Sequence, residues 1–213
     1  MYDKSALVAL MRAKALRFGD FVLASGKQTT YYLDGKQVTL DPEGARLAAE
    51  GLLDLLAQGE WPDAIGGMSI GADPITASVV TLSAVQGRPI RGFMVRKEPK
   101  SHGTGQYIEG PVVPGDRVAI VEDVVTTGGS SLQAIQRAEA YGLKVIRILA
   151  IVDRMEGGAE ALAERGYRLE SLLTTGISAS SHLNPGEIPS EVPRNPEMAC
   201  LGVPKDGAAR LES

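Results

Sequence analysis

The sequence predicts an α/β fold in which a central parallel sheet carries helices on both faces. Short apolar segments alternate with helical patterns over most of the chain, and this alternation favours parallel strands joined by crossover helices. Residues 118–121 are wholly apolar, as expected of a strand that is buried on both faces. After residue 174, repeated prolines interrupt both helical and strand periodicity, which predicts an irregular C-terminal tail.

The first residues, about 1–40, are expected to form a small N-terminal hood. Asp3 can cap a first helix, because apolar side chains follow it at helical spacing. Two short strands, 21–23 and 30–34, are expected to be joined by a turn at 25–27.

The sheet domain is expected to extend to residue 173, with 174–213 as the tail. Asp41 and Asp73 each precede a proline, and a capping residue followed by proline is typical of a helix start. Gly59, Gly87 and Gly142 supply helix ends. The predicted helices are 42–58, 74–87, 132–141 and 158–165, and the predicted strands are 64–68, 89–95, 117–122, 145–152 and 167–172.

The composition excludes several classes of protein. The 213 residues carry a net charge of −4, which offers no overall basic field for nucleic acid. One cysteine, Cys200, cannot form an internal disulfide, and His102 and His182 lack zinc-ligand spacing. No signal-peptide pattern is present, and no apolar run reaches the roughly 18 residues of a membrane span. We therefore expect a soluble, cytoplasmic protein without nucleic-acid or membrane partners.

The most informative segment is 117–131, an apolar run that ends in Glu122 and Asp123 and continues as a Thr/Gly/Ser-rich turn. Such a turn at the start of a helix binds phosphate through backbone N–H groups. Neighbouring carboxylates suit the paired hydroxyls of a ribose. Together they predict a site for a phosphorylated ribose. An ordinary strand-to-helix connection with solvated acids is the alternative.

A second segment is strongly basic: Arg96, Lys97, Lys100 and His102 accompany a single acid, Glu98. Local positive charge on an acidic protein can hold a polyphosphate. Long connections often serve as lids over binding sites. The alternative is a solvated charged loop.

The segment 117–131 resembles the phosphoribosyl pyrophosphate (PRPP) motif of the type I phosphoribosyltransferases. Within that family, Arg-Lys-Glu-Pro-Lys-Ser-His-Gly at 96–103 is similar to the catalytic loop of orotate phosphoribosyltransferases. The resemblance covers roughly residues 3–173 in order. Ala24 and Ile70 depart from it, because one branch of the family has lysine at both positions. Further matches are Ser25-Gly-Lys27, Tyr31-Tyr32, Asp34, Gly71-Ala-Asp-Pro74 and Val152-Asp-Arg154.

The resemblance implies transfer of the phosphoribosyl group from PRPP to orotate, giving orotidine 5′-monophosphate and pyrophosphate in pyrimidine nucleotide biosynthesis. It implies that residues 127–131 wrap the 5′-phosphate. Lys100 and His102 are the implied catalytic residues. The residues implied in orotate binding are Thr126, Arg154, Lys27 and Tyr32. Those implied in PRPP binding are Arg96, Lys97, Lys100, His102, Glu122, Asp123, Val124, Val125, Thr126, Thr127, Gly128, Gly129 and Ser130.

The implied cofactor is Mg²⁺, held mainly by substrate oxygens without a direct protein ligand. The basic loop is implied to reach the active site of a neighbouring subunit. The resemblance therefore implies a homodimer with shared active sites.

Three other functions fit parts of the sequence. A PRPP-sensing regulator would keep the fold without the reaction, but no nucleic-acid-binding surface is evident. A purine or uracil phosphoribosyltransferase would share the PRPP motif, but Arg154 supplies the cation that the orotate carboxylate needs. A dinucleotide-binding enzyme is disfavoured because Gly103-Thr-Gly105 lacks the third glycine of the fingerprint.

Overall fold

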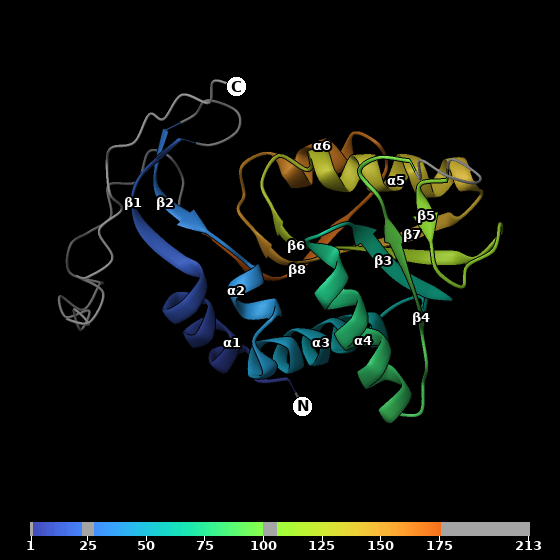
Figure 1. The fold of residues 1–213 in the computed structure, drawn as a ribbon, viewed down its shortest axis with the longest axis horizontal. Coiled ribbons are helices and arrows are strands. Elements are labelled where there is room, and N and C mark those ends of the chain that lie inside the picture. The colour runs from blue at the N-terminus through green and yellow to red at the C-terminus, as the bar shows by residue number, and fades with distance from the viewer. Residues whose placement is uncertain (1, 23–27, 100–105, 176–213) are drawn as a thin grey trace, which may run out of the picture. The chain divides into compact units, whose positions relative to one another are not determined.

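In the computed structural model, six strands form the central sheet in the order β5-β4-β3-β6-β7-β8 (Figure 1). All neighbouring pairs are parallel except β4 with the short edge strand β5. The structure describes residues 2–22, 28–99 and 106–175. The elements of the sheet domain are α3 (Pro42–Ala57), β3 (Ala64–Met68), α4 (Ala72–Val85), β4 (Arg91–Val95), β5 (Ile108–Glu109), β6 (Arg117–Val125), α5 (Gly129–Tyr141), β7 (Lys144–Asp153), α6 (Gly158–Ala163) and β8 (Leu169–Thr174).

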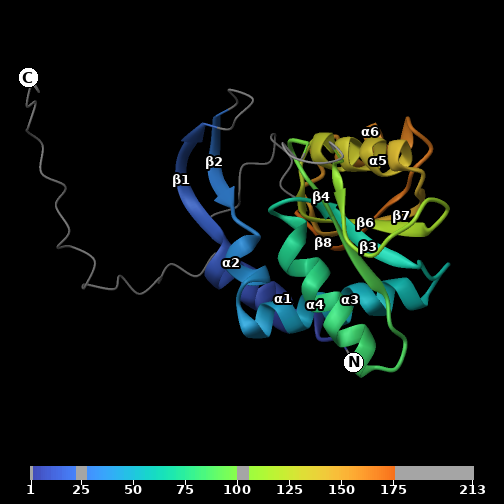
Figure 2. The ribbon, with the colours of Figure 1, turned by 45° about the vertical axis from the view of Figure 1, so that its right-hand side comes forward.

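Helices cover both faces of this sheet, so the predicted α/β class is confirmed. α3 and α4 lie on one face, and α5 and α6 lie on the other (Figures 1 and 2). Successive residues of β6 alternate between two cores: Ala119 and Val121 join the α3–α4 side, and Val118 and Ile120 join the α5 side. A strand covered on both faces needs apolar side chains at every position. Within the described part of the chain, no helix is long and apolar enough to cross a membrane.

The N-terminal hood begins with the helix that the sequence predicts. Asp3 caps it by accepting a hydrogen bond from the N–H of Ala6 at 3.0 Å. Leu7, Met11 and Ala15 are buried in the same core as α3, and this burial attaches the hood to the sheet domain. The hood elements are α1 (Lys4–Leu10), the π-helical turn η1 (Met11–Ala15), β1 (Leu16–Val22), β2 (Gln28–Leu33) and α2 (Lys36–Thr39).

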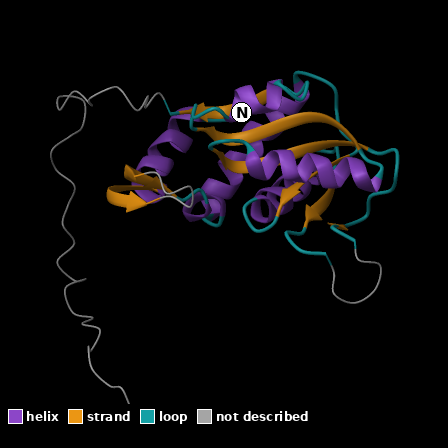
Figure 3. Ribbon diagram, turned by 90° about the horizontal axis from the view of Figure 1, so that it is seen from above, coloured by secondary structure: helices purple, strands orange, loops and turns teal. Residues whose placement is uncertain are grey.

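The two hood strands pair antiparallel and form a sheet of their own, apart from the central sheet (Figure 3). They are longer than predicted, because the pairing extends back to Leu16 opposite Leu33. The predicted turn at 25–27 lies outside the described residues.

Several element boundaries differ from the prediction near the motif at 117–131. β6 continues past its two acids to Val125, because Val124 and Val125 still pair with β7. α5 begins at Gly129, three residues before the apolar pattern at Leu132. Its first two residues are exposed, so the apolar pattern could not reveal this start.

The start of α4 and two short elements were also missed. α4 begins at Ala72, because the Asp73 carboxylate accepts a hydrogen bond from Ser69 Oγ at 2.9 Å and does not cap the helix. β5 has two residues and α2 has four, too few to produce a recognisable period.

Arg147 is a buried cation that joins β7, β8 and α3. Its guanidinium binds both carboxylate oxygens of Glu170 at 2.8 and 2.7 Å. It also donates to the carbonyls of Leu55 and Leu56 at the C-terminal end of α3, at 3.0 and 3.1 Å. These two carbonyls also accept from the backbone N–H groups of Gln58 and Gly59, at 3.1 and 3.3 Å. Arg147 therefore adds a second donor at the end of α3 and links this helix to the sheet.

We expect Arg147→Met to lower the free energy of unfolding by about 3 kcal/mol, because it leaves the Glu170 carboxylate without its buried partner and removes the link between β7 and α3. Urea unfolding followed by circular dichroism measures this change. Arg117→Met is the matched control, because Arg117 pairs with Glu60 and Asp63 on the surface and exposed pairs contribute little. Equal unfolding midpoints for the two variants would contradict the role of Arg147.

Candidate active site

The carboxyl ends of β3, β6 and β7 lie side by side at one edge of the central sheet. β3 leads through α4 to β4 on one side, whereas β6 leads through α5 to β7 on the other side. Ligands of open α/β sheets bind at the point where the connections diverge in this way. The topology therefore places a candidate site at the ends of β3 and β6.

Two buried acids stand at this point, near the end of β6. Glu122 and Asp123 are each 8% exposed. Glu122 accepts a hydrogen bond from Ser131 Oγ at 3.4 Å. Burial, together with the charge of Asp123, raises the pKa of Glu122 to about 8. Burial also raises the pKa of Asp123, against the opposing effect of the Lys36 ammonium. A ligand that donates hydrogen bonds or carries positive charge would favour the ionised pair.

The hood contributes residues to the same place. Lys36 Nζ lies 2.8 Å from Asp34 Oδ1 and 3.9 Å from Asp123 Oδ2. A Cβ atom on Gly35 would lie 2.9 Å from Asp123 Oδ2, and one on Gly71 would lie 2.8 Å from Asp123 Oδ1. Both glycines are therefore needed for the close approach of their loops to the acid.

Sequence reasoning named Asp34 and Gly71 only through the family resemblance, and it missed Gly35 and Lys36. A lysine in a short hood connection gives no local signal, because its acidic neighbour Asp123 is distant in the sequence. Only the folded hood brings them together.

The turn after β6 has the form expected of a phosphate site. Gly128 adopts a left-handed conformation with φ of 78° and precedes α5, and no side chain of the described residues caps this helix. The first N–H groups of a helix have no partner within the helix, so those at Gly129 and Ser130 are available to an anion. Thr126 is half-buried, whereas Thr127 and Ser130 are exposed.

Ser131 differs from its neighbours in the turn. The resemblance grouped it with the phosphate-binding residues, but it is buried and its hydroxyl points to Glu122. Val124 and Val125 serve mainly as strand residues, since both pair with β7.

Arg154 follows β7 directly and is 4% exposed. Its backbone N–H donates to Val125 O at 2.9 Å, which places it beside the phosphate turn. The guanidinium pairs with Glu156 at 2.8 Å and lies 4.6 Å from the ring centroid of Tyr31. Its Nε is buried without a hydrogen-bond partner among the described residues. A buried arginine with a free donor is a candidate anion-binding group.

Tyr31, rather than Tyr32, is the hood tyrosine that contacts Arg154. Side chains of successive strand residues point to opposite faces. Tyr31 is therefore buried, whereas Tyr32 is 40% exposed and packs against Phe21. The sequence named both residues but singled out Tyr32, because neither the register of β2 nor its facing arginine was visible.

The basic segment begins at the end of β4, close to the acid pair. Arg96 pairs with Glu109 at 3.5 Å. The charge of Lys97 is close enough to lower the pKa of Glu122, against the larger effect of burial. Lys27, Lys100 and His102 lie outside the described residues.

No group of three or more His, Cys, Asp and Glu side chains gathers as metal ligands within the described ranges. Glu122 and Asp123 are the buried carboxylates that stand near the end of β6. An Mg²⁺ ion there would need further oxygen ligands from water or from a bound phosphate compound.

Comparison with known proteins identifies the family. Residues 80–166 match the phosphoribosyl transferase domain. The orotate phosphoribosyltransferase of Rhodopirellula baltica is 54% identical over 177 residues, which span 81% of this chain and 92% of that protein.

Solved structures agree with this match. Orotate phosphoribosyltransferase of Mycobacterium tuberculosis, in complex with Fe(III) dicitrate, superimposes with a TM-score of 0.72 at 36% identity, covering 80% of this chain and 95% of that one. The same enzyme in complex with PRPP gives 0.68 at 33% identity, with the same coverage. The acid pair, the uncapped turn and the buried arginine therefore stand in a chain that belongs to the orotate phosphoribosyltransferase family.

Proposed function

We propose that this protein transfers the phosphoribosyl group of PRPP to orotate, releasing pyrophosphate and forming orotidine 5′-monophosphate. The observation that carries the proposal is the buried acid pair beside an uncapped helix start. The acids suit the ribose hydroxyls and the helix start suits the 5′-phosphate. The related M. tuberculosis enzyme has been solved with PRPP.

The roles of the residues follow from the charges that the reaction separates. The bond between the anomeric carbon and pyrophosphate breaks as a nitrogen of orotate bonds to that carbon, so the carbon becomes cation-like. Glu122 and Asp123, holding the ribose hydroxyls, place negative charge near it. Gly128, Gly129, Ser130 and the preceding threonines bind the 5′-phosphate.

The remaining cations are assigned to the other two anionic groups. Arg154 meets the carboxylate of orotate, because its Nε is free and it lies beside Thr126 on the adjoining strand end. Arg96, Lys97, Lys100 and His102 neutralise the pyrophosphate, with Lys100 and His102 as the catalytic residues. Lys27 and Tyr32 are proposed on the orotate side.

Mg²⁺ is proposed as the cofactor. It would be held mainly by oxygens of the substrate, and the carboxylates of Glu122 and Asp123 give the site the negative charge that suits a cation there. When bound, it neutralises charge on the departing pyrophosphate. The protein's own contribution is to keep the two acids fixed and partly shielded from water.

A homodimer with shared active sites is also proposed. A groove of about 330 Å³ between α3 and α4 is lined mainly by small and apolar side chains and ends at Val85, which is 77% exposed. This groove is small, and the proposal of a second copy rests on the family resemblance, in which the basic segment completes the partner's site.

The reaction is tested by mixing the protein with PRPP, Mg²⁺ and one base at a time, and measuring pyrophosphate release. We expect release with orotate and none with uracil, adenine or hypoxanthine. Arg154→Met should raise the KM for orotate about a hundredfold, because a charged hydrogen-bond donor is lost, while PRPP affinity by calorimetry stays unchanged. Release with uracil but not orotate would overturn the assignment of substrate.

PRPP binding should depend on pH through Glu122. Its pKa of about 8 means that the carboxyl is largely protonated near neutral pH. Ribose hydroxyls favour the ionised form, so binding must release this proton below about pH 8. Affinity for PRPP should therefore fall as pH drops from about 8 to about 7, by up to about tenfold.

Calorimetric titrations at about pH 7, about pH 8 and about pH 9 measure this dependence. Glu122→Gln should bind PRPP without the pH slope, whereas the exposed control Glu164→Gln should retain it. A wild-type affinity that stays constant over this range would show that Glu122 does not change its protonation on binding.

Shared active sites are tested by complementation of two inactive variants. If the basic segment crosses to the partner, a mixed dimer of Lys100→Ala and Asp123→Asn contains one intact site and one doubly altered site. Co-expression of both should restore about a quarter of wild-type turnover, since half of the dimers are mixed. Each single variant expressed alone is the control and should stay inactive, because its homodimers carry a defect in both sites. Absence of restored turnover in purified mixed dimers would contradict the crossing.

A further inference from the structure

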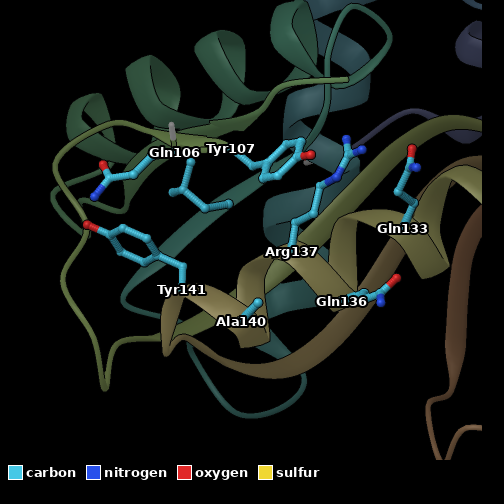
Figure 4. A pocket seen from close by; sticks show the side chains of 8 residues that line it. Gln106, Tyr107, Gln133, Gln136, Arg137, Ala140 and Tyr141 are labelled. Carbon is cyan, nitrogen blue, oxygen red and sulfur yellow. The ribbon is translucent and has the colours of Figure 1, made fainter. Parts of the chain in front are cut away.

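Arg137 contacts both ends of the connection 96–107, which follows β4 and contains the basic segment. It lies on α5, two turns after the phosphate turn. Its Nη1 donates to the carbonyl of Arg96, and its Nη2 donates to the carbonyl of Lys97 at 2.9 Å. The same guanidinium lies 4.2 Å from the ring centroid of Tyr107, and Figure 4 shows the two side chains facing each other.

The two ends of the segment are also joined directly. The N–H of Arg96 donates to the carbonyl of Tyr107 at 2.8 Å. Residues 96–97 and Tyr107 are therefore joined to each other by a backbone hydrogen bond. Arg137 on α5 contacts both of them.

Arg137 makes the main contact between this connection and α5, because a cavity lies beside it. A cavity of about 430 Å³ separates the exit of the segment from α5, lined by Gln106, Tyr107, Gln133, Gln136, Arg137 and Tyr141 among others (Figure 4). Apolar packing is therefore incomplete where the segment meets the helix. The hydrogen bonds and the ring contact of one side chain bridge this space.

We propose that Arg137 is a positioning residue, which sets the place of Arg96 and Lys97, the first residues of the basic segment, relative to the phosphate turn of the same chain. This rests on the proposed function for the role of that segment. α5 carries the phosphate turn at its first residues and Arg137 further along, so one rigid helix determines the distance between the two. Arg137 acts through Arg96 and Lys97, because its guanidinium donates to their carbonyls as well as to Met68 Sδ.

Only arginine has the geometry for this contact. Its planar guanidinium can donate to two neighbouring carbonyls while one face lies on an aromatic ring. Lysine carries the same charge but is a point donor without a planar face. Arg137→Lys should therefore restore little of what Arg137→Met removes, whereas Tyr107→Phe keeps the ring and should behave as wild type.

The contact itself is tested by amide hydrogen exchange of the full-length protein without substrates. In Arg137→Met, exchange at Arg96, Lys97 and Tyr107 should rise at least about tenfold, while amides of β6 and β7 stay unchanged. This readout does not depend on activity. Unchanged exchange at these three amides would overturn the proposal, even if turnover fell.

The role in the reaction is tested by steady-state kinetics and calorimetry. Arg137→Met should lower kcat about ten- to hundredfold, because small displacements of reacting groups are costly. PRPP affinity should fall less than kcat, by about three- to tenfold, because Arg96 and Lys97 are displaced while the acids and the phosphate turn are untouched. Loss of PRPP binding, or an unchanged kcat, would overturn the positioning role.

A second substitution distinguishes action through the segment from a general defect. In a Lys97→Ala background, Arg137→Met should lower kcat by clearly less than it does in wild type, because one of the side chains being positioned is already absent. A full additional loss would show that Arg137 acts elsewhere and would overturn the proposal. If exchange rises as expected but wild type fails to use orotate, the proposed function fails while the contact stands.

Discussion

The pairing of β6 with β3 and β7 is the constraint on which the site depends. It carries two carboxylates to the end of a strand that is buried on both faces. Burying unpaired charge is unfavourable, and the raised pKa of Glu122 is the consequence. A ligand with hydroxyl donors relieves this cost on binding. Near neutral pH the free site therefore holds Glu122 largely protonated, and a polyhydroxyl ligand shifts the carboxyl toward its ionised form.

The same sheet edge gathers groups of opposite charge at short range. Lys36 comes from the hood, Lys97 from the end of β4 and Arg154 from the end of β7. Lys36 and Arg154 pair with carboxylates, and the charge of Lys97 acts to lower the pKa of Glu122, so the cations and acids offset one another before substrate arrives. A substrate with two phosphate-bearing ends and a neutral sugar matches this pattern of charge. The sheet, the hood and the basic segment each contribute a cation to the site, because each of them has an element that ends there.

The sequence predicted the fold class well because the strongest signals were local. Apolar runs, helix caps and terminal glycines depend on neighbouring residues, so α3 and most strands were placed within a few residues. Predictions failed where tertiary pairing prolonged a strand, as at Val125, or where a helix started on exposed residues, as at Gly129. The edge strand β5 exists only because β4 is beside it.

The sequence by itself determined the acid pair, the hydroxyl-rich turn and the basic segment, because each is a run of contiguous residues. The tertiary structure alone decided which distant groups face them. It placed Lys36 beside Asp123, put Tyr31 on Arg154 and set Arg137 across the ends of the basic segment. These contacts depend on strand register and helix packing, which bring together side chains that no local pattern relates.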